Sequence, residues 1–183
     1  MPYQPRKAAQ IIAFFAMKEG GKINVLKVVK LVYLADRESV RRRGHPILDE
    51  SRVSMPHGPV NSLTLDYLNG FYRDDGGWSQ FLTDRANNNV GLAHGEITHE
   101  MLDELSQREI GILENTWTEF GDMDRFDLAD WTHDNVAEWE DPNGSSRQIP
   151  LERMISAVGL DKSIERAREL ESLNKATSFL ASL

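Results

Sequence analysis

At 183 residues, the chain is long enough for one domain, or one domain with an appendage, around a single hydrophobic core. Apolar residues make up 40% and charged residues 27%, a balance that excludes a wholly disordered chain. The absence of cysteine excludes disulfides, thiolate metal ligands and a cysteine nucleophile. No run approaches the roughly 20 apolar residues that cross a membrane, and the N-terminal residues lack the apolar stretch of a signal peptide. We therefore expect a cytoplasmic protein with no membrane partner.

The net charge of −8 is unevenly distributed along the chain. Residues 1–53 hold eleven Lys/Arg and five Asp/Glu, whereas residues 54–183 hold ten and twenty-four. Residues 109–141 are the extreme, with eleven acids and a single base, Arg125. Two interpretations stay open: these acids form solvated helix faces, or they form an acidic surface that docks a basic partner.

Two helices are predicted in the N-terminal quarter. The first begins at Pro5, carries closely spaced apolar residues and ends at the Gly20-Gly21 pair. The second spans about residues 24–43, and its apolar arc is so wide that we expect it to lie at the centre of the fold. Three arginines, residues 41–43, occupy its last turn, and Gly44 follows as the expected C-terminal cap.

The middle of the chain predicts short strands and one helix. Alternation from residue 47 to Met55 favours a strand that ends at Pro56. The elbow after it reads as a strand-to-helix joint, with Pro59 beginning a third helix that ends either at residues 69–70 or at 74–77. Residues 79–83 and 90–93 are expected to form a β-hairpin, which we expect to join the strand before Met55.

Helical spacing returns at residues 97–121. Asp127 is the expected cap of a further helix that contains Leu128, Trp131, Val136 and Trp139. After a loop at residues 141–146, two helices are expected at 151–158 and 162–180. The fold class is thus mainly α (α+β): a compact helical domain with a small β-hairpin or short sheet. We expect the domain to cover residues 1–150, with residues 151–183 forming a C-terminal helical segment.

Two motifs carry the functional argument. A helical block is followed by an elbow, Pro56-His57-Gly58-Pro59, which is rigid at its prolines and permissive at glycine. Together they resemble the signature of the Panacea family, the SocA-like antitoxin domains. The matching residues are Lys27, Lys30, Leu31, Tyr33, Leu34, Ala35, Asp36, Gly58, Pro59 and Val60. A second block, Thr132-His133, also fits the family's pattern, although no proline precedes Trp139.

The resemblance implies a non-enzymatic antitoxin that binds a cognate protein toxin directly. One variant of the family also implies an adaptor role, in which the toxin is delivered to an ATP-dependent protease. We expect the partner contact to include exposed parts of the second helix and the elbow. The candidate partner-binding residues are Lys27, Lys30, Tyr33, Asp36, Arg37, His57, Gly58, Pro59, Val60, Thr132 and His133.

Other functions find less support in the sequence. His94 and His99 are too far apart for a zinc-protease motif, and no nucleotide-binding or nucleophile-elbow motif occurs. No catalytic residue, metal or cofactor is therefore expected. The alternative function is a nucleic-acid-binding regulator, because Lys27, Lys30, Arg37 and Arg41–Arg43 are spaced to form a basic strip. The acidic remainder of the chain argues against nucleic acid as a partner, since it repels a polyanion.

Overall fold

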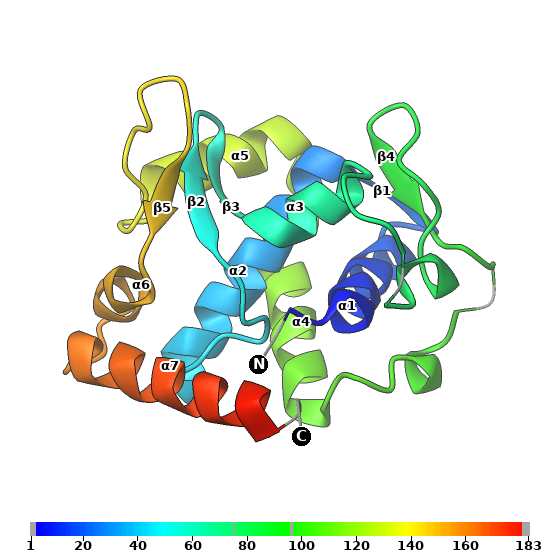
Figure 1. Cartoon of the computed structure of the whole chain (residues 1–183). Helices are drawn as coiled ribbons and strands as arrows, with labels where there is room; N and C mark the ends of the chain where they lie inside the picture. Colours follow the sequence, from blue (N-terminus) through cyan, green and yellow to red (C-terminus); the bar gives the residue numbers. More distant parts are fainter. Residues whose placement is uncertain (1–2, 75, 96, 181–183) are drawn as a thin grey trace.

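The computed structural model describes residues 3–74, 76–95 and 97–180, and it is mainly helical with two small sheets (Figure 1). This confirms the expected fold class. The α-helices are α1 (Pro5–Lys18), α2 (Val25–Arg43), α3 (Ser62–Leu68), α4 (Gln107–Phe120), α5 (Arg125–Asn135), α6 (Leu151–Ala157) and α7 (Ser163–Leu180). The strands are β1 (Lys22–Asn24), β2 (Arg52–Met55), β3 (Gly58–Asn61), β4 (Asn89–Gly91) and β5 (Arg147–Ile149). Single 3₁₀ turns lie at η1 (Trp78–Gln80) and η2 (His99–Met101).

Helix α2 is the centre of the molecule, as its wide apolar arc predicts. It is in contact with α1, α3, α4, α5, α6 and β3, and most of its residues are buried. The Asn24 side chain accepts a hydrogen bond from the Leu26 amide at its beginning. Gly44 ends the helix in the left-handed conformation, at φ 79°, which confirms the predicted cap. Helix α1 also begins at Pro5 as predicted.

The larger sheet has the strand order β3-β2-β5, and both pairings are antiparallel. Strands β2 and β3 form a hairpin in which Val53 faces Val60 and Ser54 faces Pro59. Pro59 therefore does not begin a helix, as we had expected, because α3 begins three residues later at Ser62. A proline is compatible with β3 since β3 is an edge strand, where a missing N–H leaves no ladder bond unmade.

The second hairpin belongs to a separate sheet. Strand β4 pairs with β1, and bridges join Leu82 to Leu92 and Ala86 to Asn89. The expectation that this hairpin joins the strand before Met55 is wrong. Both edges of β2 are already paired, one with β3 and the other with β5.

Two helix boundaries also differ from the predictions. Helix α4 begins only at Gln107, where Ser106 and Glu109 form a reciprocal capping box, so residues 97–106 are not part of it. Helix α5 is capped by Asp124 rather than Asp127, because the Asp124 side chain accepts from the Phe126 amide. It ends at Asn135, so Trp139 lies beyond it.

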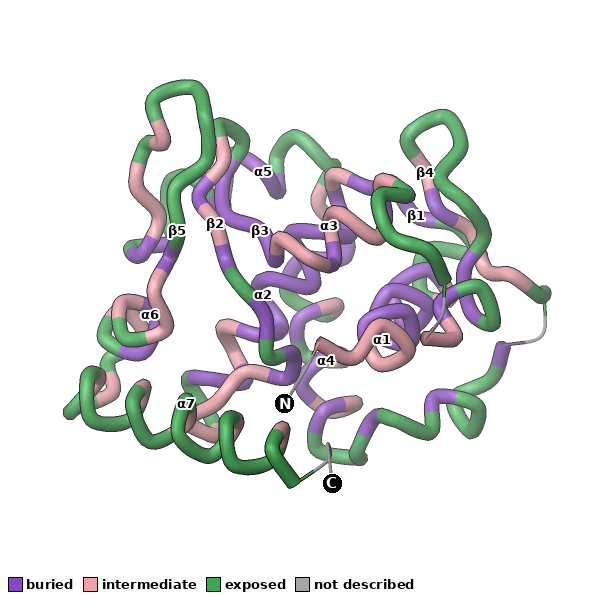
Figure 2. Tube along the Cα trace, in the orientation of Figure 1, coloured by how far each residue is buried: buried purple, intermediate pink, exposed green. Residues whose placement is uncertain are grey.

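The C-terminal part contains a strand that was not predicted, β5, and the two predicted helices. Helix α6 packs on α2 and buries Met154 and Ile155 completely. Helix α7 packs mainly on α6, buries none of its described residues, and is exposed along most of its length (Figure 2). The division of the chain at residue 150 stays a prediction. Among the described helices, none is long and apolar enough for a membrane span.

Candidate functional site

Most of the residues that carry the resemblance lie inside the molecule. Helix α2 buries Lys27, Lys30, Tyr33 and Asp36, and β3 buries Gly58, Pro59 and Val60. Thr132 of α5 is buried as well. Only three of the predicted site residues reach solvent: His57 and His133 are exposed, and Arg37 is half-buried. The resemblance is therefore built mostly from residues that hold elements together.

Gly58 lies where α2, β3 and α5 converge. A Cβ at this position would lie 2.5 Å from Thr132 Oγ1, 3.3 Å from Lys30 Nζ and 3.4 Å from the Ala129 carbonyl oxygen. Its φ of 91° is also in the region that favours glycine. Glycine is thus required twice at this position, for its backbone angle and for the close approach of α5.

The Lys30 side-chain nitrogen donates a hydrogen bond to the Pro59 carbonyl oxygen at 3.0 Å. Lys30 is only 1% exposed, and no carboxylate in the described residues forms an ion pair with it. Burial lowers the pKa of Lys30 to about 7, because a charged amine is poorly solvated in the interior. The amine ties α2 to the first residues of β3.

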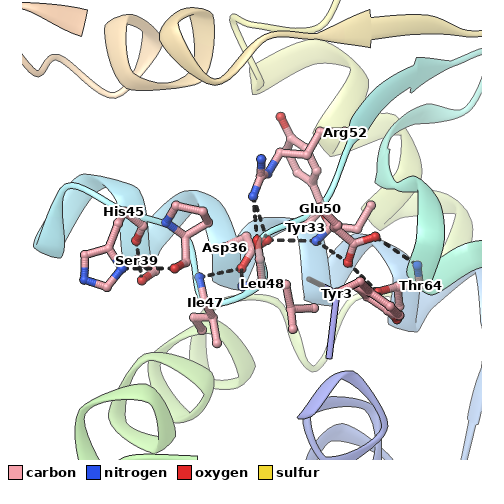
Figure 3. A network of polar contacts seen from close by, with 12 residues as sticks. Tyr3, Tyr33, Asp36, Ser39, His45, Ile47, Leu48, Glu50, Arg52 and Thr64 are labelled. Atoms are coloured by element: carbon pink, nitrogen blue, oxygen red, sulfur yellow. Dashed lines mark hydrogen bonds and ion pairs between the residues drawn. The ribbon is translucent and has the colours of Figure 1, made fainter. Parts of the chain in front are cut away.

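Asp36 organises the chain after α2 (Figure 3). Its Oδ1 accepts from the Ile47 and Leu48 amides at 2.8 and 3.0 Å. Its Oδ2 accepts from Asn61 Nδ2 at 2.8 Å and faces Arg52 Nη2 at 3.4 Å. One buried carboxylate thus fixes the loop after α2 and both strands of the β2–β3 hairpin.

A second buried carboxylate, Glu50, extends this network toward α3 (Figure 3). It accepts from the Thr64 amide at 2.9 Å and from the Thr64 hydroxyl at 2.5 Å, and Asn61 Nδ2 lies 3.3 Å away. Tyr3 is within hydrogen-bond distance of the same hydroxyl, at 3.1 Å. Burial raises the pKa of Glu50 to about 7, since the interior disfavours its charged form.

Tyr33 and Arg37, one turn apart on α2, converge on Glu138, which is completely buried. The Tyr33 hydroxyl donates to Glu138 Oε1 at 2.9 Å, and Arg37 Nε donates to the same oxygen at 2.9 Å. Burial, followed by the neighbouring Glu138 carboxylate, raises the pKa of Tyr33 well above its ordinary value, which keeps the phenol a donor. This cluster anchors the segment after α5 to the central helix.

The basic residues of α2 do not form an open strip. Lys27 donates to Glu19 and to the Gly121 carbonyl oxygen, each at 2.7 Å. Arg41 and Arg42 both pair with Glu38, and Arg43 lies 3.5 Å from Glu109. Lys30 is buried and Arg37 pairs with Glu138, so Arg41 and Arg42 are the exposed cations of α2, and both already pair with Glu38. This arrangement does not favour a phosphate-binding strip along the helix.

Three side chains form a rim over this buried framework, which we call the signature rim: His57, His133 and Trp139. His57 lies in the turn between β2 and β3 and is exposed. The Trp139 indole donates to the Met55 carbonyl oxygen at 3.0 Å, and the His133 ring lies 4.0 Å from the Trp139 ring. The rim thus joins the hairpin tip to the end of α5. No group of three or more His, Asp or Glu side chains among the described residues is placed to hold a metal ion.

The family model for the SocA-like antitoxin, Panacea domain, matches residues 28–140. The chain belongs to this family. No curated protein and no solved structure matches the chain. The Panacea match begins inside α2 and ends one residue after Trp139, so it contains Lys30, the β2–β3 hairpin, α5 and the whole signature rim.

Sequence reasoning missed several residues that build this Panacea domain. Glu138 stands in an acidic segment, where nothing in the spacing separates a buried carboxylate from a solvated one. Glu50, Arg52 and Asn61 were not singled out either, because they lie in short strands and loops without a helical period. The one available signal was the order of the motifs along the chain. Asp36 ends the helical motif, and the groups that donate hydrogen bonds to its carboxylate follow within the next 25 residues.

A pH dependence follows from the buried Lys30 of this Panacea domain. Its pKa is about 7 in the folded state and about 10.5 in the unfolded chain, so between these values only the unfolded chain holds the proton. The free energy of unfolding should therefore rise with pH across this window, by about 1 kcal/mol per pH unit from this group. Urea unfolding at several pH values checks this. Lys30→Met should remove the rise, whereas Lys27→Met, the matched control, should keep it.

Proposed function

We propose that this Panacea domain is an antitoxin that neutralises a cognate protein toxin by direct binding, and that it is not itself an enzyme. The family membership is the observation that carries the proposal. The framework supports it, since Lys30, Asp36 and Gly58 lock the hairpin and α5 against α2. A surface held this way needs little ordering when a partner binds, and preorganisation favours affinity.

We propose that the toxin contacts the signature rim. Of the candidate partner-binding residues, the buried ones, which include Lys30, Tyr33 and Thr132, act by holding the rim in place. His57 and His133 reach solvent and touch the partner directly. Trp139 joins them because an aromatic residue at a surface turn is typical of interface hot spots. Its indole N–H is already satisfied by Met55, so the ring keeps one orientation.

Replacing both exposed histidines, as His57→Ala/His133→Ala, should weaken toxin binding by about tenfold or more, because the two most exposed side chains of the rim are lost. The measurement is rescue of growth when the variant is co-expressed with the protein encoded next to its own gene, together with the dissociation constant of the purified pair. His94→Ala, which removes an exposed histidine elsewhere, is the matched control. Full rescue by the double variant at wild-type affinity means that the rim is not the contact.

The family resemblance implies two modes of neutralisation, a direct block and delivery of the toxin to an ATP-dependent protease. We propose the direct block as the primary mode. Rescue of growth in a host that lacks such proteases supports it, and a toxin level that falls only when the protease is present supports delivery. The site of action proposed for either mode is the cytoplasm. The alternative of a nucleic-acid-binding regulator gains no support from the engaged cations of α2.

A further inference from the structure

The solvent-facing side of α5 carries a large apolar side chain, Phe126. Phe126 is 58% exposed in the first turn of the helix, while Leu128 and Ala129 fill its inner side. Asp130 and His133 follow Phe126 at four and seven residues, so they share its face. An exposed aromatic ring among polar residues is typical of a protein-binding surface rather than of plain solvent contact.

Carboxylates are concentrated on the exposed side of the same helix, whereas Arg85 and Arg125 line the hollow beside the ring. Asp127, Asp130 and Asp134 lie at spacings of three and seven residues on the exposed side of α5, and Asp122 is exposed in the turn before it. Within the described ranges, Asp122, Asp127 and Asp130 form no ion pair, and Asp134 pairs only with His133. The one cation of the segment, Arg125, lies over the Phe126 ring at 4.6 Å. We call Phe126 with these four aspartates the acidic face.

The arginines of α2 and the aspartates of the acidic face differ in how many ion pairs they form. The arginines of α2 pair with Glu38, Glu109 and Glu138, and Arg41 and Arg42 share Glu38 at the surface. Within the described residues, three aspartates of the acidic face have no cationic partner and Asp134 has only His133, so their charges repel one another. A basic protein surface relieves that repulsion and also covers Phe126, whereas a nucleic acid adds to it.

We propose that the acidic face docks a basic protein surface, with Phe126 inserted between lysine or arginine side chains. This deepens the proposed function, on which it rests, since α5 also carries His133 of the signature rim. The two surfaces share helix α5, on which Phe126 lies in the first turn and His133 near the last residue. The toxin expected from this geometry is a cationic protein, and the carboxylates speed its approach while Phe126 slows its departure.

Two short fluorescent peptides test the acidic face without the toxin, one of alternating lysine and leucine and one of alternating glutamate and leucine. Fluorescence anisotropy should show binding of the lysine peptide alone. Asp122→Lys/Asp130→Lys should weaken it by about tenfold, and Phe126→Ala by about fivefold at unchanged charge. Glu165→Lys/Glu169→Lys, on exposed acids of α7, is the matched charge control and should leave the affinity within about twofold of wild type.

The proposal is wrong if the Asp122→Lys/Asp130→Lys and Glu165→Lys/Glu169→Lys variants weaken binding of the lysine peptide equally. It is also wrong if Phe126→Ala leaves that binding unchanged. Binding of the purified protein encoded by the adjacent gene distinguishes failure of this inference from failure of the proposed function. If that protein binds the wild type and the acidic-face variants equally but not the histidine double variant, the function holds and this inference fails. If it binds none of them while the lysine peptide keeps the expected pattern, the antitoxin proposal fails and the basic-partner surface stands.

Discussion

Replacing Asp36 by alanine is expected to lower the free energy of unfolding by about 3–5 kcal/mol, because it leaves the Arg52 guanidinium buried without its carboxylate. Arg52 is 4% exposed, and its other acceptor among the described residues is the Leu48 carbonyl oxygen at 2.8 Å. The Ile47 and Leu48 amides lose their acceptor in the same step. Each buried donor without an acceptor adds about 1–3 kcal/mol of desolvation cost, although these costs overlap. Urea unfolding followed by circular dichroism measures the loss.

A double variant separates the charge from the hydrogen bonds. In Asp36→Ala/Arg52→Met the unpaired charge is gone, so about 1–3 kcal/mol of stability should return relative to Asp36→Ala alone. Asp130→Ala, on the solvent side of α5, should stay within about 0.5 kcal/mol of wild type. If Asp36→Ala costs no more than this control, Asp36 does not organise the hairpin.

Gly58→Ala should destabilise the domain by a similar amount, about 2–6 kcal/mol in total. The left-handed φ of 91° strains any residue with a Cβ, at about 1–3 kcal/mol. The new Cβ also meets Thr132 Oγ1 at 2.5 Å, and overpacking of this kind costs about 1–3 kcal/mol. The change in the midpoint of thermal or urea unfolding is the measurement.

Gly20→Ala is the matched control, because Gly20 has a similar φ of 96° with nothing within 4 Å of its Cβ position. It should therefore show only the backbone part of the cost. Adding Thr132→Ala to Gly58→Ala removes the clashing hydroxyl and should restore part of the stability, although the strain of the backbone stays. Additive effects of Gly58→Ala and Thr132→Ala would contradict the contact between β3 and α5.

Both predictions follow from the same property of the Panacea signature in this chain. The block on α2 and the Gly58-Pro59-Val60 elbow are buried and hold a strand pair and a helix against the centre. The residues that carry the family signature therefore form the buried framework rather than an exposed surface. We propose that the choice of partner depends on residues outside it, at the signature rim and on the acidic face, where side chains reach solvent.

The sequence predicted the elements whose signals are local. Pro5 and the Gly20-Gly21 pair bracket α1, and the wide apolar arc with Gly44 places α2. Polar alternation predicted β2, and the two C-terminal helices were found within one residue of their ends. These features depend on neighbours a few residues apart, which a single sequence displays directly.

Other boundaries required contacts that local patterns do not carry. Strand β5 has only three residues, two of them exposed and charged or polar, and it becomes a strand by pairing with β2 almost a hundred positions earlier in the chain. Helix α4 was predicted ten residues too long, because apolar residues at Leu102 and Leu105 continue its period although they pack from outside the helix. The Ser106 capping box decides its start.

For the candidate site, the sequence by itself determined the residue types: a lysine, a tyrosine and an aspartate in order on one helix, and a glycine between two prolines. Only the tertiary structure decided that these side chains point inward, and that Glu138 and Thr132 complete them from more than seventy positions away. The physical reason is that burial of a charged group depends on what packs around it. Helical spacing says which residues share a face, and the rest of the chain says whether that face meets water.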